Sequence, residues 1–555
     1  MSVIPAKSSE RPQPPATVVI AVADAEQDAL RKGVIATEIS PRVARLMTVL
    51  FLVALFGVPL FQAACELARG QPVQALTIFK FREIPSKQAL DEFESNMRTS
   101  SVLKRCVEPR IQALLSAALG FGNSKVVIGR SGWLFYLPGI EYVMGPPLLD
   151  RGALKSRGRK LSESGEDSPN PDPRPAILRF HRDCVAAGVQ LIVLPIPDKA
   201  TLQPAQLTAR FAAAPSIAVA DNPGYDQLLA ELRQAGVDIY DARPVGVAAG
   251  DERFLRQDTH WTPDWMEEVA RGVSAHVTQT TSLPALAHPF KPTIEAQQIA
   301  NTGDIAAMLK LDASQTVCPQ QTVTVHRISD AEHGTAWAPE TSADIVLLGD
   351  SFSNIYSAEA MGWGGAAGLG AQLSRFLERP IDVIARNGSG ATVTRQEFAA
   401  RPNPFLGKRV VIWEFAVREL ANQNWIPIPV DPPRAAPGNP GNGKQPTPKP
   451  AEQLTLVGEL LTKVRSFDVD EYPDVLLTLR FKVREVKSGT YTAQEVVVNM
   501  YGAKNRKLLP AATYRLGQAC HLTISSEAPP ETRTIKTLNF AKGTDQPLWA
   551  VVTGE

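Results

Sequence analysis

The strongest hydrophobic pattern in the chain is a run of twenty uncharged, mostly apolar residues, LMTVLFLVALFGVPLFQAAC, between Arg45 and Glu66. A run of this length is typical of a helix that spans a bilayer. Four Lys or Arg residues occupy positions 31–45 and two occupy positions 66–80, a bias that favours a cytoplasmic N-terminus and an exported body. We therefore predict a transmembrane signal anchor over 45–65. A cleaved signal peptide is the alternative, although its polar leader would be unusually long.

Three polar or amphipathic segments frame the rest of the chain. Residues 1–44 are rich in Pro, Ser, Ala and charge, which predicts a disordered cytoplasmic tail. Residues 66–125 have an amphipathic pattern and are expected to form a helical stalk. Residues 427–453, PIPVDPPRAAPGNPGNGKQPTPKPAEQ, cannot build a packed core, so we interpret them as a Pro-rich linker between domains.

Between the stalk and this linker, residues 126–426 alternate apolar runs with helical patterns. VQLIVLPIP, ADIVLLGD and KRVVIWEFA are continuous apolar runs, typical of parallel strands that are buried on both faces. Helical segments such as YDQLLAELRQAG and TPDWMEEVARGVSAHV separate the strands. The pattern predicts a three-layer α/β domain with a largely parallel sheet. Residues 155–174 are polar and proline-rich, and we expect a surface insertion there.

The pattern changes again beyond the linker. Residues 454–555 contain alternating or β-branched runs, including DVLLTLRFKVREV and TAQEVVVNMYG, between short turns. They predict a small β-barrel or β-sandwich domain. No constellation of catalytic residue types is evident in this part of the sequence.

Composition narrows the classes of function. The 58 basic and 57 acidic residues nearly cancel, so the basic excess that is typical of nucleic-acid binding is missing. The five cysteines include no CxxC pair, which gives no indication of a zinc or redox motif. One or two disulfides are compatible with the sequence, but their pairing cannot be read from it.

The segment VLLGDSFSN contains a serine, Ser351, directly after a predicted strand. In parallel α/β sheets, functional groups gather at the carboxyl ends of strands. A serine there can be a nucleophile whose own backbone N–H helps to stabilise an oxyanion. The structural alternative is that Ser351 or Asp350 only caps the following helix.

A serine nucleophile needs a base and an acid that orients the base, and RQDTHWTPD offers both. Asp258 and His260 are two residues apart, so in extended backbone they project to the same side. The carboxylate can then hold the tautomer of the imidazole while the other ring nitrogen faces Ser351. An isolated Asp–x–His pair is more often structural, but its occurrence together with GDS favours catalysis.

These motifs resemble those of the alginate O-acetyltransferase family (AlgX and AlgJ), which has an SGNH-hydrolase-like fold. GDSFS and DTHW carry the resemblance, with GRSGWLFY near the domain start and LPIPDKAT at 194–201. In ordinary SGNH hydrolases the serine block comes first, whereas here, as in the alginate family, the Asp–His pair precedes the serine. The resemblance implies that Ser351 is the nucleophile, His260 the general base and Asp258 its orienting acid.

Other site residues are weaker candidates. Asn387 or the Gly388 amide, in ARNGSGA, could complete an oxyanion hole, and a plain glycine turn is the alternative. Lys199, in the family-like PDKAT, is a candidate for substrate binding. Trp261 is a candidate for stacking on a sugar ring, although core packing is the commoner fate of tryptophan.

The resemblance implies an inner-membrane, single-pass O-acetyltransferase with its catalytic domain in the periplasm. It would transfer acetyl groups through an acetyl-serine to hydroxyls of an exported, alginate-like polysaccharide, without a metal or another cofactor. The family also implies a membrane-bound O-acyltransferase that supplies the acetyl group. Two alternatives stay open: an SGNH-type carbohydrate esterase or deacetylase with the same triad, and a non-catalytic polysaccharide-binding scaffold of a secretion complex.

Overall fold

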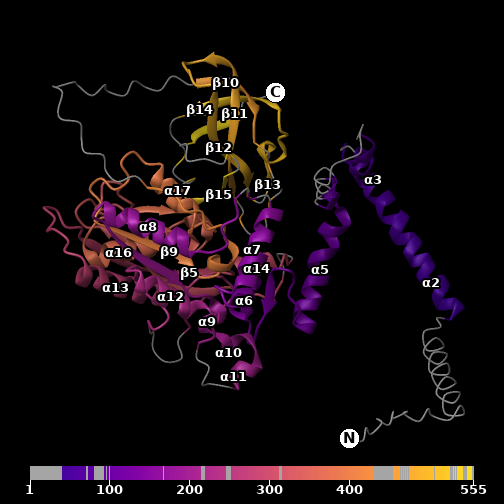
Figure 1. Ribbon diagram of the computed structural model, residues 1–555. Helices are drawn as coiled ribbons and strands as arrows, with labels where there is room; N and C mark the ends of the chain where they lie inside the picture. Colours follow the sequence, from indigo (N-terminus) through magenta and orange to yellow (C-terminus); the bar gives the residue numbers. More distant parts are fainter. Residues whose placement is uncertain are drawn as a thin grey trace, which may run out of the picture. The chain divides into compact units, whose positions relative to one another are not determined.

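The computed structural model describes residues 40–552 with gaps, of which the longest are 81–89, 214–218, 246–251, 431–453 and 542–546. Most of the predicted tail at 1–44 and the predicted linker beyond residue 430 lie outside the described residues. The chain divides into two compact units, residues 1–108 and 109–555 (Figure 1), which are described separately.

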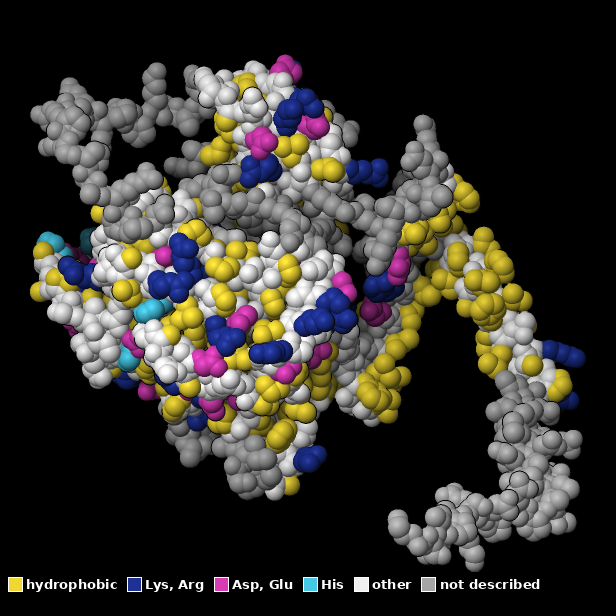
Figure 2. Space-filling model, viewed as in Figure 1, with side chains coloured by type: hydrophobic (Ala, Val, Ile, Leu, Met, Phe, Trp, Pro, Cys, Tyr) yellow, Lys and Arg dark blue, Asp and Glu magenta, His cyan; other side chains and the backbone are white. Residues whose placement is uncertain are grey.

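The first unit contains one long apolar helix over Pro41–Ala68. It comprises α2 (Pro41–Leu52), a π-helical turn at Val53–Gly57, and α3 (Val58–Ala68). Its 28 residues have a mean hydropathy of 2.2 in the most apolar stretch. Apolar side chains cover its surface (Figure 2). The helix is long and apolar enough to cross a membrane, which agrees with the predicted span at 45–65.

The second unit is built on a five-stranded sheet with the strand order β4-β3-β9-β7-β8. Every neighbouring pair of strands is parallel. The strands are β3 (Gln190–Ile196), β4 (Asp238–Ile239), β7 (Ile345–Gly349), β8 (Asp382–Ala385) and β9 (Val410–Ala416).

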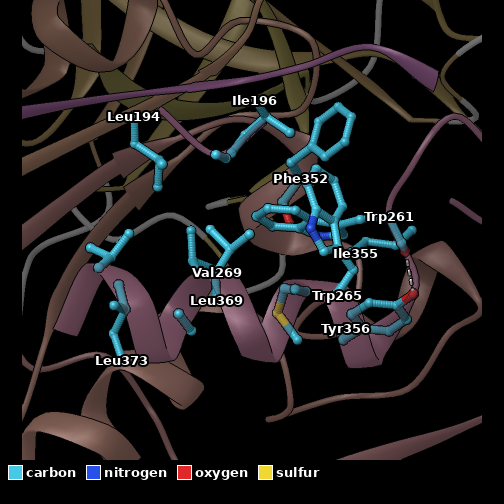
Figure 3. Packing of buried hydrophobic residues seen from close by; sticks show 14 of the residues in the cluster. Leu194, Ile196, Trp261, Trp265, Val269, Phe352, Ile355, Tyr356, Leu369 and Leu373 are labelled. Atoms are coloured by element: carbon cyan, nitrogen blue, oxygen red, sulfur yellow. Dashed lines mark hydrogen bonds between the residues drawn. The ribbon is translucent and has the colours of Figure 1, made fainter. Parts of the chain in front are cut away.

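Helices cover both faces of this sheet because alternate strand residues point to opposite sides. Ile192 and Leu194 of β3 pack in one cluster with α13 (Pro263–Thr280) and α16 (Leu369–Leu377). Figure 3 shows this cluster, in which Leu194 and Ile196 lie over Val269, Leu369 and Leu373. Leu191 and Val193 pack in the second cluster with α8 (Arg174–Ala186) and α12 (Tyr225–Gln234). The predicted three-layer α/β domain is confirmed.

Two segments contain elements that the sequence analysis did not predict. The polar stretch at 155–174 is partly helical, since α7 spans Arg151–Glu163, with Asp150 accepting a hydrogen bond from the Ala153 N–H (2.8 Å). The antiparallel hairpin of β5 (Pro292–Asn301) and β6 (Gln321–Asp330) was not predicted. Most of β5 is exposed, so its sequence lacks the apolar alternation that marks a strand.

The C-terminal part of this unit is a small β-barrel. Its sheet has the order β13-β12-β16-β14-β10-β11-β15, and β11 also pairs with β12, which closes the barrel. Closure decides between the barrel and the sandwich. The strands are β10 (Leu454–Leu460), β11 (Val475–Ser488), β12 (Glu495–Lys504), β13 (Lys507–Leu508), β14 (Ala519–Ser525), β15 (Lys536–Asn539) and β16 (Leu548–Val552). The five cysteines, all among the described residues, are free thiols.

Candidate active site

Ser351 lies at the carboxyl edge of the parallel sheet. The strand β7 ends at Gly349, and Ser351 is the first residue of the short helix α15 (Ser351–Asn354). Asp350, and not Ser351, is the N-cap, since its side chain accepts a hydrogen bond from the Phe352 N–H (2.8 Å). The hydroxyl of Ser351 is therefore not needed as a cap, and the residue lines a cavity.

A buried carboxyl group of β9 supports this turn from below. Glu414 accepts hydrogen bonds from the Asp350 N–H (3.0 Å) and the Ser353 hydroxyl (2.6 Å). Asp350 in turn accepts one from the Ala416 N–H (3.0 Å). Burial and the nearby charge of Asp350 raise the pKa of Glu414 well above its ordinary value. The backbone at Ser351 is thus fixed by strand-to-strand contacts of polar side chains.

His260 is held by Asp258 in the manner expected of a base and its orienting acid. The His260 Nδ1 lies 2.5 Å from Asp258 Oδ1, and the His260 N–H donates to the same oxygen (3.1 Å). The other ring nitrogen, Nε2, is buried and has no hydrogen-bond partner among the described residues. Asp258, His260 and Ser351 line the same cavity. The arrangement leaves Nε2 available to accept a proton.

Asp258 and His260 each shift the pKa of the other in the direction that favours the charged form. Burial alone would lower the pKa of His260, but the attraction of Asp258 and the hydrogen bond to it outweigh burial and raise the pKa. Burial would likewise raise the pKa of Asp258, but the charge of His260 and hydrogen bonds from His260 and Trp363 bring it below its ordinary value. Asp258 is therefore ionised at neutral pH.

Two further residues complete this environment, and the sequence analysis missed both. Trp363 Nε1 donates to Asp258 Oδ2 (2.9 Å), as does the Asp304 N–H (3.0 Å). Asp304 accepts bonds from the Thr259 N–H (2.7 Å) and hydroxyl (2.5 Å). Burial and the charge of Asp258 raise the pKa of Asp304 to about 6. Neither residue carries a local motif, since both meet Asp258 only in the folded chain.

Asp258, His260 and Asp304 also have the residue types of metal ligands, with candidate atoms within 4.8 Å of one another. However, the separation of 2.5 Å between His260 Nδ1 and Asp258 Oδ1 is that of a charge-assisted hydrogen bond. Two ligands of one ion at about 2.0–2.2 Å from it would lie farther apart. His260 Nδ1 and Asp258 Oδ1 are therefore hydrogen-bonded to each other, and their separation is not that of two ligands of one metal ion.

The cavity has a volume of about 370 Å³, and both domains of the unit line it. Asn387 lies in its wall, and its Oδ1 accepts a hydrogen bond from Asn354 Nδ2 (2.9 Å). Gly388 does not line the cavity, and its carbonyl accepts a hydrogen bond from Lys536 Nζ. Of the two oxyanion candidates, Asn387 lines the same cavity as Ser351 and Gly388 does not.

The structure places the two substrate-binding candidates in the core. Lys199 is 2% exposed, and its Nζ donates to the carbonyls of Leu134 (2.9 Å) and Arg256 (3.3 Å). Trp261 is fully buried, and its Nε1 donates a hydrogen bond to the Phe352 carbonyl (3.1 Å). Figure 3 shows Trp261 packed on Phe352. The Tyr356 hydroxyl donates a hydrogen bond to the backbone carbonyl of Trp261. The expectation that Lys199 and Trp261 face the substrate cavity is therefore corrected.

Arg418 is a cavity residue that the sequence analysis did not single out. It follows β9 by two residues, so the rule that functional groups gather at the carboxyl ends of parallel strands could have identified it. Its guanidinium lies 5.6 Å from the centre of the Phe352 ring, and its Nη1 bonds to Asp198 (3.2 Å). The charge of Asp198 and of Asp350 keeps its pKa raised despite burial. Arg418, paired with Asp198, thus places a positive charge in the wall of the cavity that Ser351 also lines.

Comparison with known proteins identifies the family of this chain. A family model described as SGNH hydrolase-like domain, acetyltransferase AlgX, matches residues 126–417. The "Probable alginate O-acetylase AlgJ" of Pseudomonas aeruginosa is 27% identical over 331 residues, which cover 56% of this chain and 75% of the relative. That of Azotobacter vinelandii is 26% identical over 327 residues, or 56% and 73% of the two chains.

Two solved structures are also similar. The O-acetyltransferase domain of Pseudomonas putida AlgJ has 22% identity and a TM-score of 0.41, and covers 54% of this chain and 93% of that chain. Pseudomonas aeruginosa AlgX has 14% identity and a TM-score of 0.36, and covers 69% and 83%. Since the family model matches more than half of the 555 residues, the chain belongs to the AlgX family of SGNH hydrolase-like acetyltransferases.

Proposed function

We propose that this protein is an O-acetyltransferase that moves an acetyl group through an acetyl-Ser351 intermediate to hydroxyls of an exported, alginate-like polysaccharide. The observation that carries the proposal is the buried, unpartnered Nε2 of His260, whose opposite ring nitrogen is fixed on Asp258, in the cavity that Ser351 lines. Relatives in this family are named as alginate O-acetylases, which supports the substrate class.

In the first half of the reaction, His260 Nε2 removes the proton of the Ser351 hydroxyl as Oγ attacks the acetyl carbonyl of the donor. The bond from Oγ to the carbonyl carbon forms, and the carbonyl oxygen becomes an oxyanion. When the intermediate collapses, the bond to the donor's leaving group breaks, and His260 returns its proton to that group. Asp258 stabilises the imidazolium that exists between these steps.

In the second half, a sugar hydroxyl takes the place of the leaving group. His260 removes the proton of the sugar hydroxyl while the hydroxyl oxygen attacks the acetyl carbon. The bond from the acetyl carbon to Ser351 Oγ then breaks, and His260 gives its proton back to Oγ. The Ser351 N–H and Asn387, which lines the cavity, are the proposed oxyanion donors. Arg418 adds a positive charge to the wall of the same cavity.

The experiment that tests this function compares the purified full-length protein with its Ser351→Ala variant. Each is incubated with an acetyl ester and alginate oligosaccharides, and the sugars are analysed by mass spectrometry. We expect acetylated sugar with the parent and none with the variant. The matched control is Ser342→Ala, an exposed serine of the same domain, which should acetylate like the parent.

The other possible outcomes separate the alternatives. Free acetate without acetylated sugar, still dependent on Ser351, would replace the transferase with an esterase or deacetylase. Binding of the oligosaccharide without turnover of any ester by the parent would instead favour the scaffold.

We further propose that the helix over Pro41–Ala68 is an uncleaved anchor in the inner membrane, with the catalytic domain in the periplasm. A membrane-bound O-acyltransferase would then supply acetyl groups from the cytoplasmic side. Fractionation of cells tests the anchor. The full-length chain should stay in the membrane after carbonate extraction, whereas a shortened, soluble chain would contradict it.

A further inference from the structure

The cavity at Ser351 is not built by the catalytic domain alone. Residues of the barrel line it together with Ser351 and His260. They include Tyr472, Asp474, Tyr501, Lys504 and Lys536. We propose that the C-terminal barrel is the acceptor-binding element of the active site and binds an acidic sugar chain in the cavity at Ser351. This inference rests on the proposed acetyl transfer and adds where the acceptor binds.

The connectivity of the barrel supports this role. Around the closed barrel the strands follow the order β10-β11-β12-β16-β14 and return to β10. The β12–β16 pair is parallel, and the other pairs of this ring are antiparallel. Numbered along the chain, with the short β13 and β15 set aside, this is the order 1-2-3-5-4 of an OB-fold. OB-folds bind oligonucleotides and oligosaccharides on strands 2–3 and on the loops between strands 1–2 and 4–5.

The residues that line the cavity come from this same face. Tyr472 and Asp474 belong to the loop between the first two strands, β10 and β11. Tyr501 and Lys504 lie at the end of the third strand, β12. Residues 534–536 lie between the fourth and fifth strands, β14 and β16. The barrel therefore turns its usual ligand-binding edge toward the nucleophile.

This edge is fixed on the catalytic domain by contacts with the turn that carries Asn387. Arg386 Nη1 donates to the Thr532 carbonyl (3.1 Å), and the Asn387 N–H lies 3.4 Å from the Thr534 carbonyl. Lys536 Nζ donates to the carbonyl of Gly388. The 386–388 turn thus links the oxyanion candidate to the fourth-to-fifth-strand loop.

The chemistry of the barrel wall suits a carboxylated sugar. Lys504 Nζ lies 4.7 Å from the centre of the Tyr501 ring, and Lys536 Nζ lies 5.0 Å from that of Tyr472. Lys504 offers an ammonium group for a carboxylate next to an aromatic ring for a sugar face. Lys536, whose Nζ also donates to the Gly388 carbonyl, adds a second positive charge beside a ring. With Arg418 on the opposite domain, three cations line the cavity. Its acidic lining residues are Asp258, Asp304 and Asp474, and each of them accepts hydrogen bonds from protein groups.

The test measures binding without turnover, using the full-length Ser351→Ala protein in detergent. Titration calorimetry is run with a uronic-acid oligosaccharide and with a neutral cello-oligosaccharide. Adding Lys504→Ala should weaken binding of the uronic-acid oligomer about tenfold and reduce its salt dependence, because one charge-assisted contact is lost. The control is Lys482→Ala, an exposed lysine of β11 outside the cavity, which should bind like the parent.

Kinetics on the otherwise native enzyme give a second readout. With Lys504→Ala, the change should fall on the KM for the acceptor more than on kcat. Equal affinity of Lys504→Ala and its parent for the acidic oligomer, or stronger binding of the neutral one, would overturn the barrel site. Failure of acetyl transfer by the native protein, with the Lys504 effect on binding intact, would instead overturn the proposed function.

Discussion

At the scale of single residues, the pairing of Asp258 with His260 sets the pH dependence. Only neutral His260 can act as a base, and its pKa is raised above the ordinary 6.5, chiefly by Asp258 against the opposing effect of burial. Turnover of an acetyl ester should therefore rise with pH through a pKa above 6.5. A pH–rate profile with a midpoint below that value would contradict the assigned pair.

Removing the carboxylate should change both the profile and the maximum rate. Asp258→Asn removes the attraction that raises the pKa of His260, so the rising limb should move to lower pH. The wrong tautomer would then lower kcat by about 10²–10⁴-fold. Measurement of kcat from pH 5 to 9, with circular dichroism as the control for folding, checks this prediction. A variant with the kcat of the parent would mean that Asp258 is structural.

Asp304 should have a smaller effect of the same sign. Its charge contributes to the raised pKa of His260, and its own pKa is raised to about 6. Asp304→Asn should therefore move the rising limb to lower pH, while kcat on the plateau falls less than in Asp258→Asn. The two profiles, recorded side by side, make the comparison. A limb that moves to higher pH would contradict this view of Asp304.

Short motifs were enough to nominate Asp258, His260 and Ser351, and the structure brings the three to one cavity. Such motifs could not predict Asp304 or Trp363, which meet Asp258 across 46 and 105 residues of chain. Lys199 was a candidate through the family-like PDKAT, and a short motif does not show whether its side chain is buried. A lysine in a loop is usually solvated, but here two backbone carbonyls satisfy its ammonium group in the core.

At the scale of elements, hydrogen bonds to Glu414 link β9 to the turn between β7 and α15 that carries Ser351. A carboxyl with a raised pKa binds more protons in the folded than in the unfolded chain, so its stabilisation is lost as pH rises above its unfolded value near 4.5. Glu414→Gln removes this titration and keeps the shape. The stability of the variant relative to the parent should therefore increase from pH 5 to pH 8.

Urea unfolding at the two pH values measures this difference. Glu414→Ala is the matched contrast, because it leaves the Asp350 N–H and the Ser353 hydroxyl without their acceptor. It should destabilise the domain by about 1–3 kcal/mol at both pH values. A Glu414→Gln variant that loses stability relative to the parent as pH rises would show that Glu414 acts as a charged group.

The elements themselves were predictable where one physical rule dominates. Continuous apolar runs marked β3, β7 and β9, and the helical pattern of TPDWMEEVARGVSAHV marked α13, which begins at Pro263 with Thr262 as its N-cap. The β5–β6 hairpin was not predicted because β5 is mostly exposed and lacks apolar alternation, although Val325 and Ile328 of β6 are buried. Strand order and barrel closure depend on pairing between distant segments, which periodicity does not encode.

At the scale of the whole molecule, docking of the barrel on the 386–388 turn should control activity. A Cβ at Gly388 would overlap the Tyr472 hydroxyl and lie 2.9 Å from Lys536 Nζ, at a φ of +65°. Gly388→Ala should therefore loosen the docked edge. Hydrogen exchange should increase at residues 532–536, and kcat for a small acetyl ester should fall.

The control for this variant is Gly407→Ala, which has a similar φ of +74° but open space around the added methyl group. It reproduces the backbone strain without the overlap. Equal hydrogen exchange and equal kcat in the two variants would mean that backbone strain, and not docking of the barrel, is responsible.

The measurement that tests the central claim most directly is the position of the acetyl group during turnover. The full-length protein is mixed with an acetyl ester, quenched with acid within one turnover, digested and sequenced by mass spectrometry. The account predicts acetyl on the peptide that contains Ser351, and its loss when an acceptor oligosaccharide is added before the quench. An acetyl group on another residue, or undiminished transfer by Ser351→Ala, would contradict it.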